Sequence, residues 1–257
     1  MDSPAHPPPP NRSLPAFPGG TSLSHLSVYD WDAADGCAGG TPHLHTVSTE
    51  AYVVTGGSGE VHTISAEGPR QDPLEAGTLL WFTPGTVHRL VNHGDLQLNV
   101  IMSNAGLPEA GDAVMLFPDE ILADPEAYRR AATLPGEETA RAEAARRRRD
   151  LAIVGYGELL AAVEAHGPSA LERVYARAVD LVRPKTSDWE RIFAANVEES
   201  VARTRTQLDA LARGNGSHLG QATVIRGNPR PGPKLWGMCG RLQTWTGDQV
   251  PDGDPTP

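Results

Sequence analysis

A short segment containing two histidines and a glutamate places the strongest constraint on the fold of this chain. His43 and His45 are separated by one residue, Glu50 follows five residues later, and Gly57 comes seven residues after the glutamate. Alternate side chains of an extended strand share a face, so His43 and His45 point the same way. Glu50 is at odd spacing from both histidines, and a turn or bulge within residues 46–49 is therefore expected to restore its facing.

A second segment, residues 77–92, adds another histidine among turn-forming residues. Gly77 opens it, Gly85 precedes His88 by three residues, and Asn92 follows His88 by four. Together the two segments offer three imidazoles and one carboxylate. This combination suits a divalent transition metal and leaves positions open for water or substrate. We therefore predict a metal site formed by His43, His45, Glu50 and His88.

These residues resemble the two conserved motifs of the cupin superfamily. The first motif matches from Glu50 through Gly57, whereas its leading glycine is offset, with Gly39 and Gly40 closer to His43 than usual. In the second motif, glycine, histidine and asparagine positions are filled. Pro84 stands directly before Gly85, so Thr83 occupies the usual proline position. This departure affects a turn and no ligand.

The resemblance covers residues 23 to 118 and implies an antiparallel β jelly-roll barrel with the metal in its interior. The alternative is a degenerate barrel that binds no metal. Fe(II) is favoured as the single divalent ion, while Mn(II), Ni(II), Zn(II) and Co(II) suit the same ligands. The other histidines are interpreted as ordinary core or surface residues: His25, His62, His93, His166 and His218.

The charge and composition of the chain limit the kinds of molecule that it is expected to bind. The net charge is −10, and residues 23–118 contain eleven acidic residues but only two basic ones, Arg70 and Arg89. Such a surface disfavours nucleic acid and polyanionic substrates, so a neutral, cationic or singly charged small molecule is expected. No apolar run approaches the roughly 20 residues of a membrane span. Two cysteines and an N-terminus without a signal-peptide pattern indicate a cytoplasmic protein.

The periodicity of the chain predicts an α+β protein in which a barrel is followed by a mainly helical appendage. Residues 1–22 are rich in proline and are expected to be disordered, as are residues 251–257. Between them, residues 23–118 have the pattern of a β barrel, 119–214 that of helices, and 215–250 that of strands returning to the body. The strands expected in the barrel are residues 24–31, 43–47, 50–55, 59–66, 78–83, 88–92 and 96–103.

Four helices are expected after Pro118, at residues 119–134, 138–167, 169–182 and 187–214. The last carries an apolar stripe suited to packing against the barrel, against a partner copy or against itself. Arg146 to Arg149 lie beside Glu143 and Asp150, and we interpret them as a solvated helix face rather than an anion site. The apolar residues within 234–245 are expected to pack back on an element already formed.

Three further residues are candidates for substrate contact. Tyr52 shares the face of Glu50, Trp81 or its neighbour Phe82 can supply an aromatic wall, and Asn92 shares the face of His88. Glu50 is also a candidate catalytic base. We expect a homodimeric enzyme, with metal-dependent dioxygenase chemistry ahead of isomerase or cyclase chemistry. A non-catalytic ligand-binding module remains the alternative, because the cupin fold does not determine function.

Overall fold

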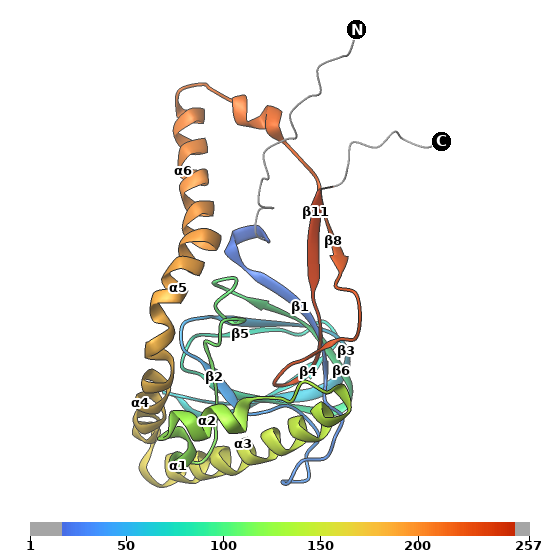
Figure 1. Cartoon of the computed structure of the whole chain (residues 1–257), viewed down its shortest axis with the longest axis vertical. Helices are drawn as coiled ribbons and strands as arrows, with labels where there is room; N and C mark the ends of the chain where they lie inside the picture. The colour runs from blue at the N-terminus through green and yellow to red at the C-terminus, as the bar shows by residue number, and fades with distance from the viewer. Residues whose placement is uncertain (1–16, 250–257) are drawn as a thin grey trace, which may run out of the picture.

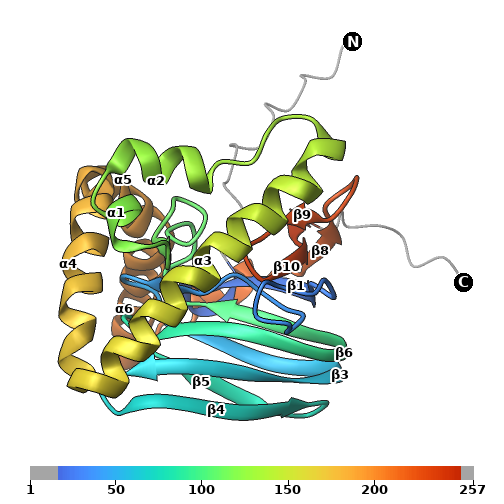
Figure 2. The same cartoon turned by 90° about the horizontal axis from the view of Figure 1, so that it is seen from below.

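The computed structural model describes residues 17–249 and shows a β barrel with helices across one face and along an adjacent side (Figures 1 and 2). The main sheet has the strand order β4-β3-β6-β1-β10-β9, with β2 bridging β6 to β7 and β5 added to β3. The first seven strands are β1 (Ser22–Val28), β2 (His43–His45), β3 (Glu50–Ser65), β4 (Gly68–Glu75), β5 (Leu79–Phe82), β6 (Val87–Met102) and β7 (Ala113–Met115).

Two long strands hold the barrel together. β3 and β6 have 16 residues each and pair antiparallel from Glu50↔Met102 to Ile64↔Val87. β3 also pairs with β5 near its start and with β4 near its end, so this one strand joins two parts of the barrel wall. The interior is filled by residues of β3 and β6, among them Tyr52, Val61, Leu90 and Leu98, together with Leu26 of β1.

The expected breaks within these two strands are bends instead. Residues 50–55 and 59–66 form the single strand β3, and residues 88–92 and 96–103 fall in the single strand β6. The pairing shifts register between Val54 and Gly59, where Gly57 has a φ of 70°. A Cβ at Gly57 would stand 2.1 Å from the carbonyl oxygen of Asp95. Glycine therefore lets the strands bend at this point without ending.

Two strands were not expected. β4 contains Pro69 and Pro73, and proline weakens a strand prediction because it cannot donate to the ladder. β4 tolerates both because it pairs only with β3 and forms an edge of the sheet. β7 has three residues and pairs with β2, and it is too short for a sequence pattern.

The region after Pro118 is helical, as expected. Its helices are α1 (Asp119–Leu122), α2 (Pro125–Ala132), α3 (Glu138–His166), α4 (Leu171–Val182), α5 (Thr186–Phe193) and α6 (Glu199–Ala212). The expected helix at residues 119–134 is broken because Pro125 starts a new helix, with the Asp124 side chain accepting hydrogen bonds from two backbone N–H groups. α5 and α6 are joined by a π-helical turn, Ala194–Glu198.

Helix α3 crosses the outer face of the barrel (Figure 2). Its apolar residues meet Leu44, Ile64 and Val87, whose neighbours in sequence point into the barrel. This contact forms a second core outside the barrel. The ligand-bearing strands are therefore packed on both faces.

The interpretation of Arg146 to Arg149 as a solvated face is wrong for two of the four residues. Arg148 and Arg149 are 7% and 1% exposed. Arg149 donates to the carbonyl oxygens of Trp31 and Asp32 at 2.6 and 2.7 Å, which fastens α3 to the loop before β2. A guanidinium supplies several donors for such carbonyls, and sequence pattern alone does not reveal those partners.

The C-terminal segment returns to the barrel. Its strands are β8 (Ile225–Pro229), β9 (Leu235–Trp236), β10 (Gly240–Gln243) and β11 (Trp245–Gln249). β10 pairs antiparallel with β1 and adds a strand to the main sheet, whereas β8 and β11 form a separate hairpin. The expected tail at residues 251–257 lies outside the described residues. So do residues 1–16, while Pro18–Gly20 form a short turn and β1 begins before residue 23.

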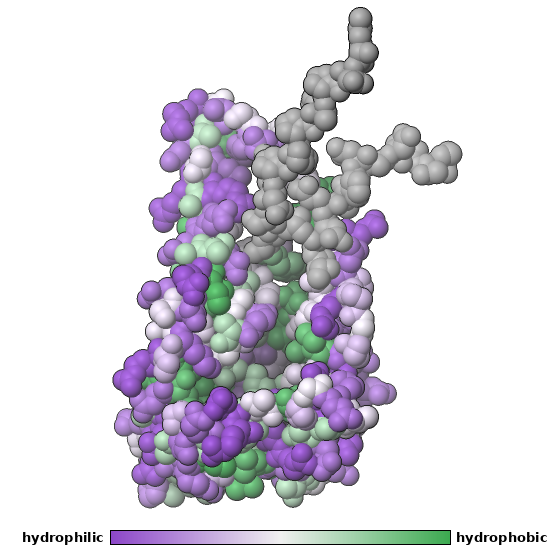
Figure 3. Space-filling model, viewed as in Figure 1, coloured by the Kyte–Doolittle hydropathy of each residue, from purple (hydrophilic) through white to green (hydrophobic). Residues whose placement is uncertain are grey.

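The far end of the helical region extends away from the barrel (Figure 1). Trp189 in α5 is buried, but Val201, Leu208 and Leu211 in α6 remain 48–60% exposed. The apolar stripe expected in residues 187–214 thus packs in its first half only. Figure 3 shows apolar residues along a recess between this arm and the β8–β11 hairpin. Within residues 17–249, no helix is both long and apolar enough to cross a membrane.

Candidate metal centre

Strands β2 and β6 bring the three histidines together. His43 and His88 are directly opposite each other in the antiparallel pair. His45 follows His43 on the same face, as period-two alternation requires. The intervening Leu44 packs on the opposite side against the helices.

Glu50 reaches the histidines because the chain bends between β2 and β3. Residues 46 and 47 form a bend, and β3 starts at Glu50 itself. The backbone N–H and the hydroxyl of Thr46 both donate hydrogen bonds to the carbonyl oxygen of Asp112, and these bonds hold the bend in place. The predicted change of facing between His45 and Glu50 is thereby achieved.

The four side chains form a compact, buried group. Their ligand atoms lie within 4.8 Å of one another. Glu50 Oε2 is 3.2 Å from Nε2 of His45 and 3.1 Å from Nε2 of His88, which is itself 3.1 Å from Nε2 of His43. None of the four residues is more than 6% exposed. This is the cluster predicted from the sequence.

The outer nitrogen of each imidazole has its own acceptor. Nδ1 of His43 is 2.8 Å from the carbonyl oxygen of Thr41, and Nδ1 of His88 is 3.1 Å from that of Thr86. Nδ1 of His45 is 2.6 Å from Oδ1 of Asp112. With Nδ1 donating, Nε2 of each ring presents a lone pair to the centre of the cluster.

Such an arrangement fits a metal cation. Three Nε2 lone pairs and the carboxylate of Glu50 face one another, and Glu50 Oε2 has no hydrogen-bond partner among the described residues. Acceptors brought together in this way repel one another unless a cation lies between them. The residues present therefore suit a divalent transition metal.

The acid–base properties of the cluster agree with this. Burial lowers the pKa of His43, and it keeps this imidazole neutral. Burial opposes ionisation of Glu50, but the charges of His88 and His45 hold its pKa well below the usual range. For His45, the effect of burial is outweighed by the neighbouring carboxylates of Asp112 and Glu50, which raise its pKa to about 9. A proton on Nε2 of His45 and a metal ion therefore compete for one position.

Asp112 is a functional candidate that the sequence did not reveal. It is fully buried, it lies 67 residues from His45 in the chain, and it falls between the barrel motifs and the helices. Burial opposes its ionisation, while the hydrogen bond with His45 holds its pKa below the usual range. A carboxylate in this position orients a metal-binding imidazole and increases its basicity.

The three expected substrate contacts differ in their surroundings. Tyr52 is completely buried, and its hydroxyl has no hydrogen-bond partner among the described residues. Burial and the charge of Glu50 raise its pKa. Trp81 is 64% exposed on the outer side of β5, whereas the ring of Phe82 lies 4.3 Å from that of His88. The aromatic wall next to the histidines is thus Phe82 and not Trp81.

The expected role of Asn92 in substrate binding does not agree with its contacts. Its Nδ2 donates to the carbonyl oxygens of Val28 and Tyr29, and its Oδ1 accepts from the N–H groups of Gly94 and Leu96. Every polar atom of the side chain is therefore used by the backbone. Asn92 stabilises the bend in β6 and has no free group for a substrate.

A cavity of about 690 Å³ is lined by residues of β3, β4 and β5, and none of the four metal-ligand candidates lines it directly. Phe82 and Thr63 line it, and these residues also border His88, through ring contact and as its cross-strand partner. Trp81, which is largely exposed, and Tyr175 line it as well. A volume of this size is typical of small-molecule sites.

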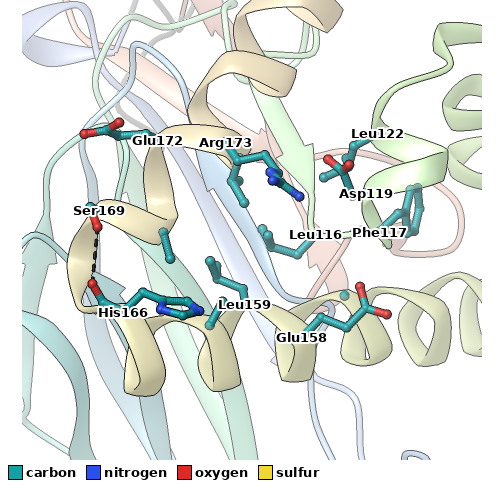
Figure 4. Close-up of a pocket in the computed structure, with 14 residues that line it drawn as sticks. Leu116, Phe117, Asp119, Leu122, Glu158, Leu159, His166, Ser169, Glu172 and Arg173 are labelled. Atoms are coloured by element: carbon teal, nitrogen blue, oxygen red, sulfur yellow. Dashed lines mark hydrogen bonds between the residues drawn. The ribbon is translucent and has the colours of Figure 1, made fainter.

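A second cavity, shown in Figure 4, lies among α1, α3 and α4, and none of the four metal-ligand candidates lines it. Its floor is apolar, with Leu116, Leu159 and Val174, and its rim carries exposed charged groups such as Glu158 and Arg173. No side-chain atom of a lining residue is both buried and without a hydrogen-bond partner. We therefore assign no chemistry to this cavity.

Comparison with known proteins identifies the barrel. Residues 31–104 match the family model for the cupin domain, and this part of the chain is a cupin domain. No curated protein matches the chain.

Similar solved structures include a variant of PAC13 from Streptomyces with uridine, at 16% identity, covering 41% of this chain and 71% of that chain, with a TM-score of 0.30. An uncharacterised double-stranded β-helix protein from Klebsiella pneumoniae shares 18% identity over 37% of this chain and 71% of that chain, with a TM-score of 0.27. KdgF from Halomonas sp. shares 22% identity over 32% of this chain and 69% of that chain, with a TM-score of 0.26. At these values the likenesses carry no information about the reaction of this chain.

Proposed function

We propose that this protein is a metal-dependent enzyme acting on a small organic molecule, with Fe(II) dioxygenase chemistry favoured. The observation that carries the proposal is the convergence of three Nε2 atoms and one carboxylate oxygen, with every Nδ1 atom held by a separate acceptor. His43, His45, Glu50 and His88 would hold the ion. A bound metal of this type supplies Lewis acidity and, if it is redox-active, a site for oxygen.

The residues around the cluster would bind and orient the substrate. In the cavity between β4 and β5, Phe82 and Trp81 offer apolar and aromatic surface, while Arg70 and Asp72 supply charge at its edge. A small aromatic or polar metabolite suits these walls. Trp81 therefore remains a proposed substrate contact in this cavity.

Tyr52 and Glu50 favour a second candidate function, which is isomerisation or cyclisation. The two side chains lie on the same face of β3, and the hydroxyl of Tyr52 is free of other partners. Glu50 can accept a proton and Tyr52 can donate one to a substrate held between them. Such a reaction requires a metal to polarise a carbonyl but needs no oxygen.

Oxygen consumption distinguishes the two candidates. Protein reconstituted with Fe(II) is mixed with candidate aromatic metabolites in an oxygen-electrode cell, and product is measured in parallel. The dioxygenase proposal predicts that oxygen uptake matches product formation. Equal turnover under strict anaerobiosis, or with Zn(II) in place of Fe(II), would exclude the dioxygenase and favour the isomerase. Stoichiometric metal without turnover of any candidate would favour a non-catalytic binding module.

A further inference from the structure

A separate cavity of about 690 Å³ lies between the outer face of the barrel and helix α3. Arg70 and Arg89, the two basic residues of the segment from residue 23 to residue 118, both line it. His62, the cross-strand partner of Arg89, lines it as well. The positive groups of an otherwise acidic barrel are thus gathered at one place.

Arg89 is buried and incompletely paired. The residue is 2% exposed, and its Nη1 contacts Oδ2 of Asp35. Its Nε and Nη2 atoms are buried without a hydrogen-bond partner among the described residues. A buried charged group with unused donors is costly, so a missing acceptor is expected at this position.

The two unpaired nitrogens define the shape of that acceptor. Nε–H and Nη2–H form the side edge of the guanidinium, where two parallel N–H bonds match the two oxygens of a carboxylate. Asp35 contacts Nη1 at the end of the group and leaves this edge free. A planar anion is therefore preferred to a spherical one.

The surrounding charges limit the ligand to a single negative charge. Arg70 is paired with Asp72, His62 with Glu60, and Glu164 lies exposed among the lining residues. Little positive charge remains for a dianion. Apart from Gln71 and Gly157, the rest of the lining offers apolar surface that suits an apolar body: Pro69, Ile153, Tyr156 and Leu160.

We propose that this cavity binds a small monocarboxylate with an apolar body, its carboxylate paired with Nε and Nη2 of Arg89. The site is distinct from the metal centre because His88 and Arg89 are consecutive in β6 and face opposite sides of the strand. Entry of the ligand requires a side-chain shift at Arg89 or Tyr156, since both nitrogens are enclosed. The inference does not depend on the reaction at the metal.

The test compares acids with their uncharged amides on the full, metal-loaded chain. Benzoate and hexanoate are titrated by calorimetry alongside benzamide and hexanamide. Hydrogen bonds to a charged group predict that each acid binds at least about tenfold more tightly than its amide. Arg89→Met should abolish this preference, whereas Arg173→Met, which changes an exposed arginine of the cavity in Figure 4, should leave it intact.

A second variant protects the test against misfolding of Arg89→Met. Leu160→Trp fills the cavity from α3 without removing the guanidinium, and it should eliminate acid binding while metal content stays unchanged. Equal binding of acid and amide, no binding of either acid, or an unaltered preference in Arg89→Met or Leu160→Trp would overturn the proposal.

Discussion

At the scale of single residues, Asp112 extends the metal centre beyond its four ligands. Its carboxylate holds Nδ1 of His45 at 2.6 Å and so fixes the direction of Nε2. Partners of this kind often matter almost as much as the ligands. Mutation of Asp112 should therefore affect metal binding, as mutation of the histidines should.

Asp112→Asn should weaken metal binding by about 10- to 100-fold without unfolding the barrel. Asparagine keeps the shape of the side chain but loses the negative charge that makes His45 a better donor. Competition with a chromophoric chelator measures the affinity. Asp119→Asn is the matched control, because Asp119 pairs with Arg177 at the surface and should retain wild-type affinity. Equal affinity of Asp112→Asn and wild type would contradict this role.

The four ligand candidates were predictable because their spacing and flanking glycines specify the strands that carry them. Asp112 was not, because a lone aspartate outside a motif gives no signal until the chain folds. The sequence could not tell whether Phe82 or Trp81 faces the metal ligands. The strand register Glu50↔Phe82 answers this, because directly paired residues share a face of the sheet. Asn92 matched its motif position, but the hydrogen bonds that occupy it depend on the bend in β6.

At the scale of elements, α3 is fastened to the barrel by a buried arginine. Arg149 is 1% exposed and donates to carbonyl oxygens of the loop before β2, and its Nε is 3.0 Å from Oδ1 of Asp150. Since these carbonyls lose their donor when the guanidinium is removed, α3 and this loop should become less stable together.

Arg149→Met should reduce the free energy of unfolding by about 1–3 kcal/mol, because two part-buried carbonyls lose a charged donor. Urea denaturation followed by circular dichroism measures it. Arg147→Met is the control on the same helix, since the Arg147 side chain is 65% exposed, and its effect should stay within about 0.5 kcal/mol. Similar losses in the two variants would show that burial of Arg149 contributes nothing specific.

The elements themselves were predicted unevenly. The helices after Pro118 could be predicted from the helical spacing of their apolar residues and from the proline and glycine residues at their ends. Strands β3 and β6 were predicted in pieces, because a glycine cluster reads equally well as a turn or as a bulge. The edge strand β4 was missed on account of Pro69 and Pro73, which only its position at the edge makes acceptable.

At the scale of the whole molecule, the expected homodimer stays a prediction. α6 leaves Val201, Leu208 and Leu211 exposed on the arm that extends from the barrel. If a second copy covers this surface, light scattering of the purified protein should give about twice the 27.4 kDa of one chain. Replacing Leu208 and Leu211 with Asp should then reduce the mass to that of one chain and leave metal content unchanged. A wild-type mass of one chain at micromolar concentration would exclude the dimer.

The central claim is that His43, His45, Glu50 and His88 bind one metal ion, and metal analysis tests it most directly. Elemental analysis of protein purified without an affinity tag should give about one transition-metal ion per chain. His45→Ala and His88→Ala should each lose most of it, because three ligands of a buried site cannot replace the fourth. His62→Ala, which changes a histidine outside the cluster, should keep it. The assignment would be contradicted if the His45 and His88 variants kept their full metal content. It would also be contradicted if the wild type bound no metal even after reconstitution.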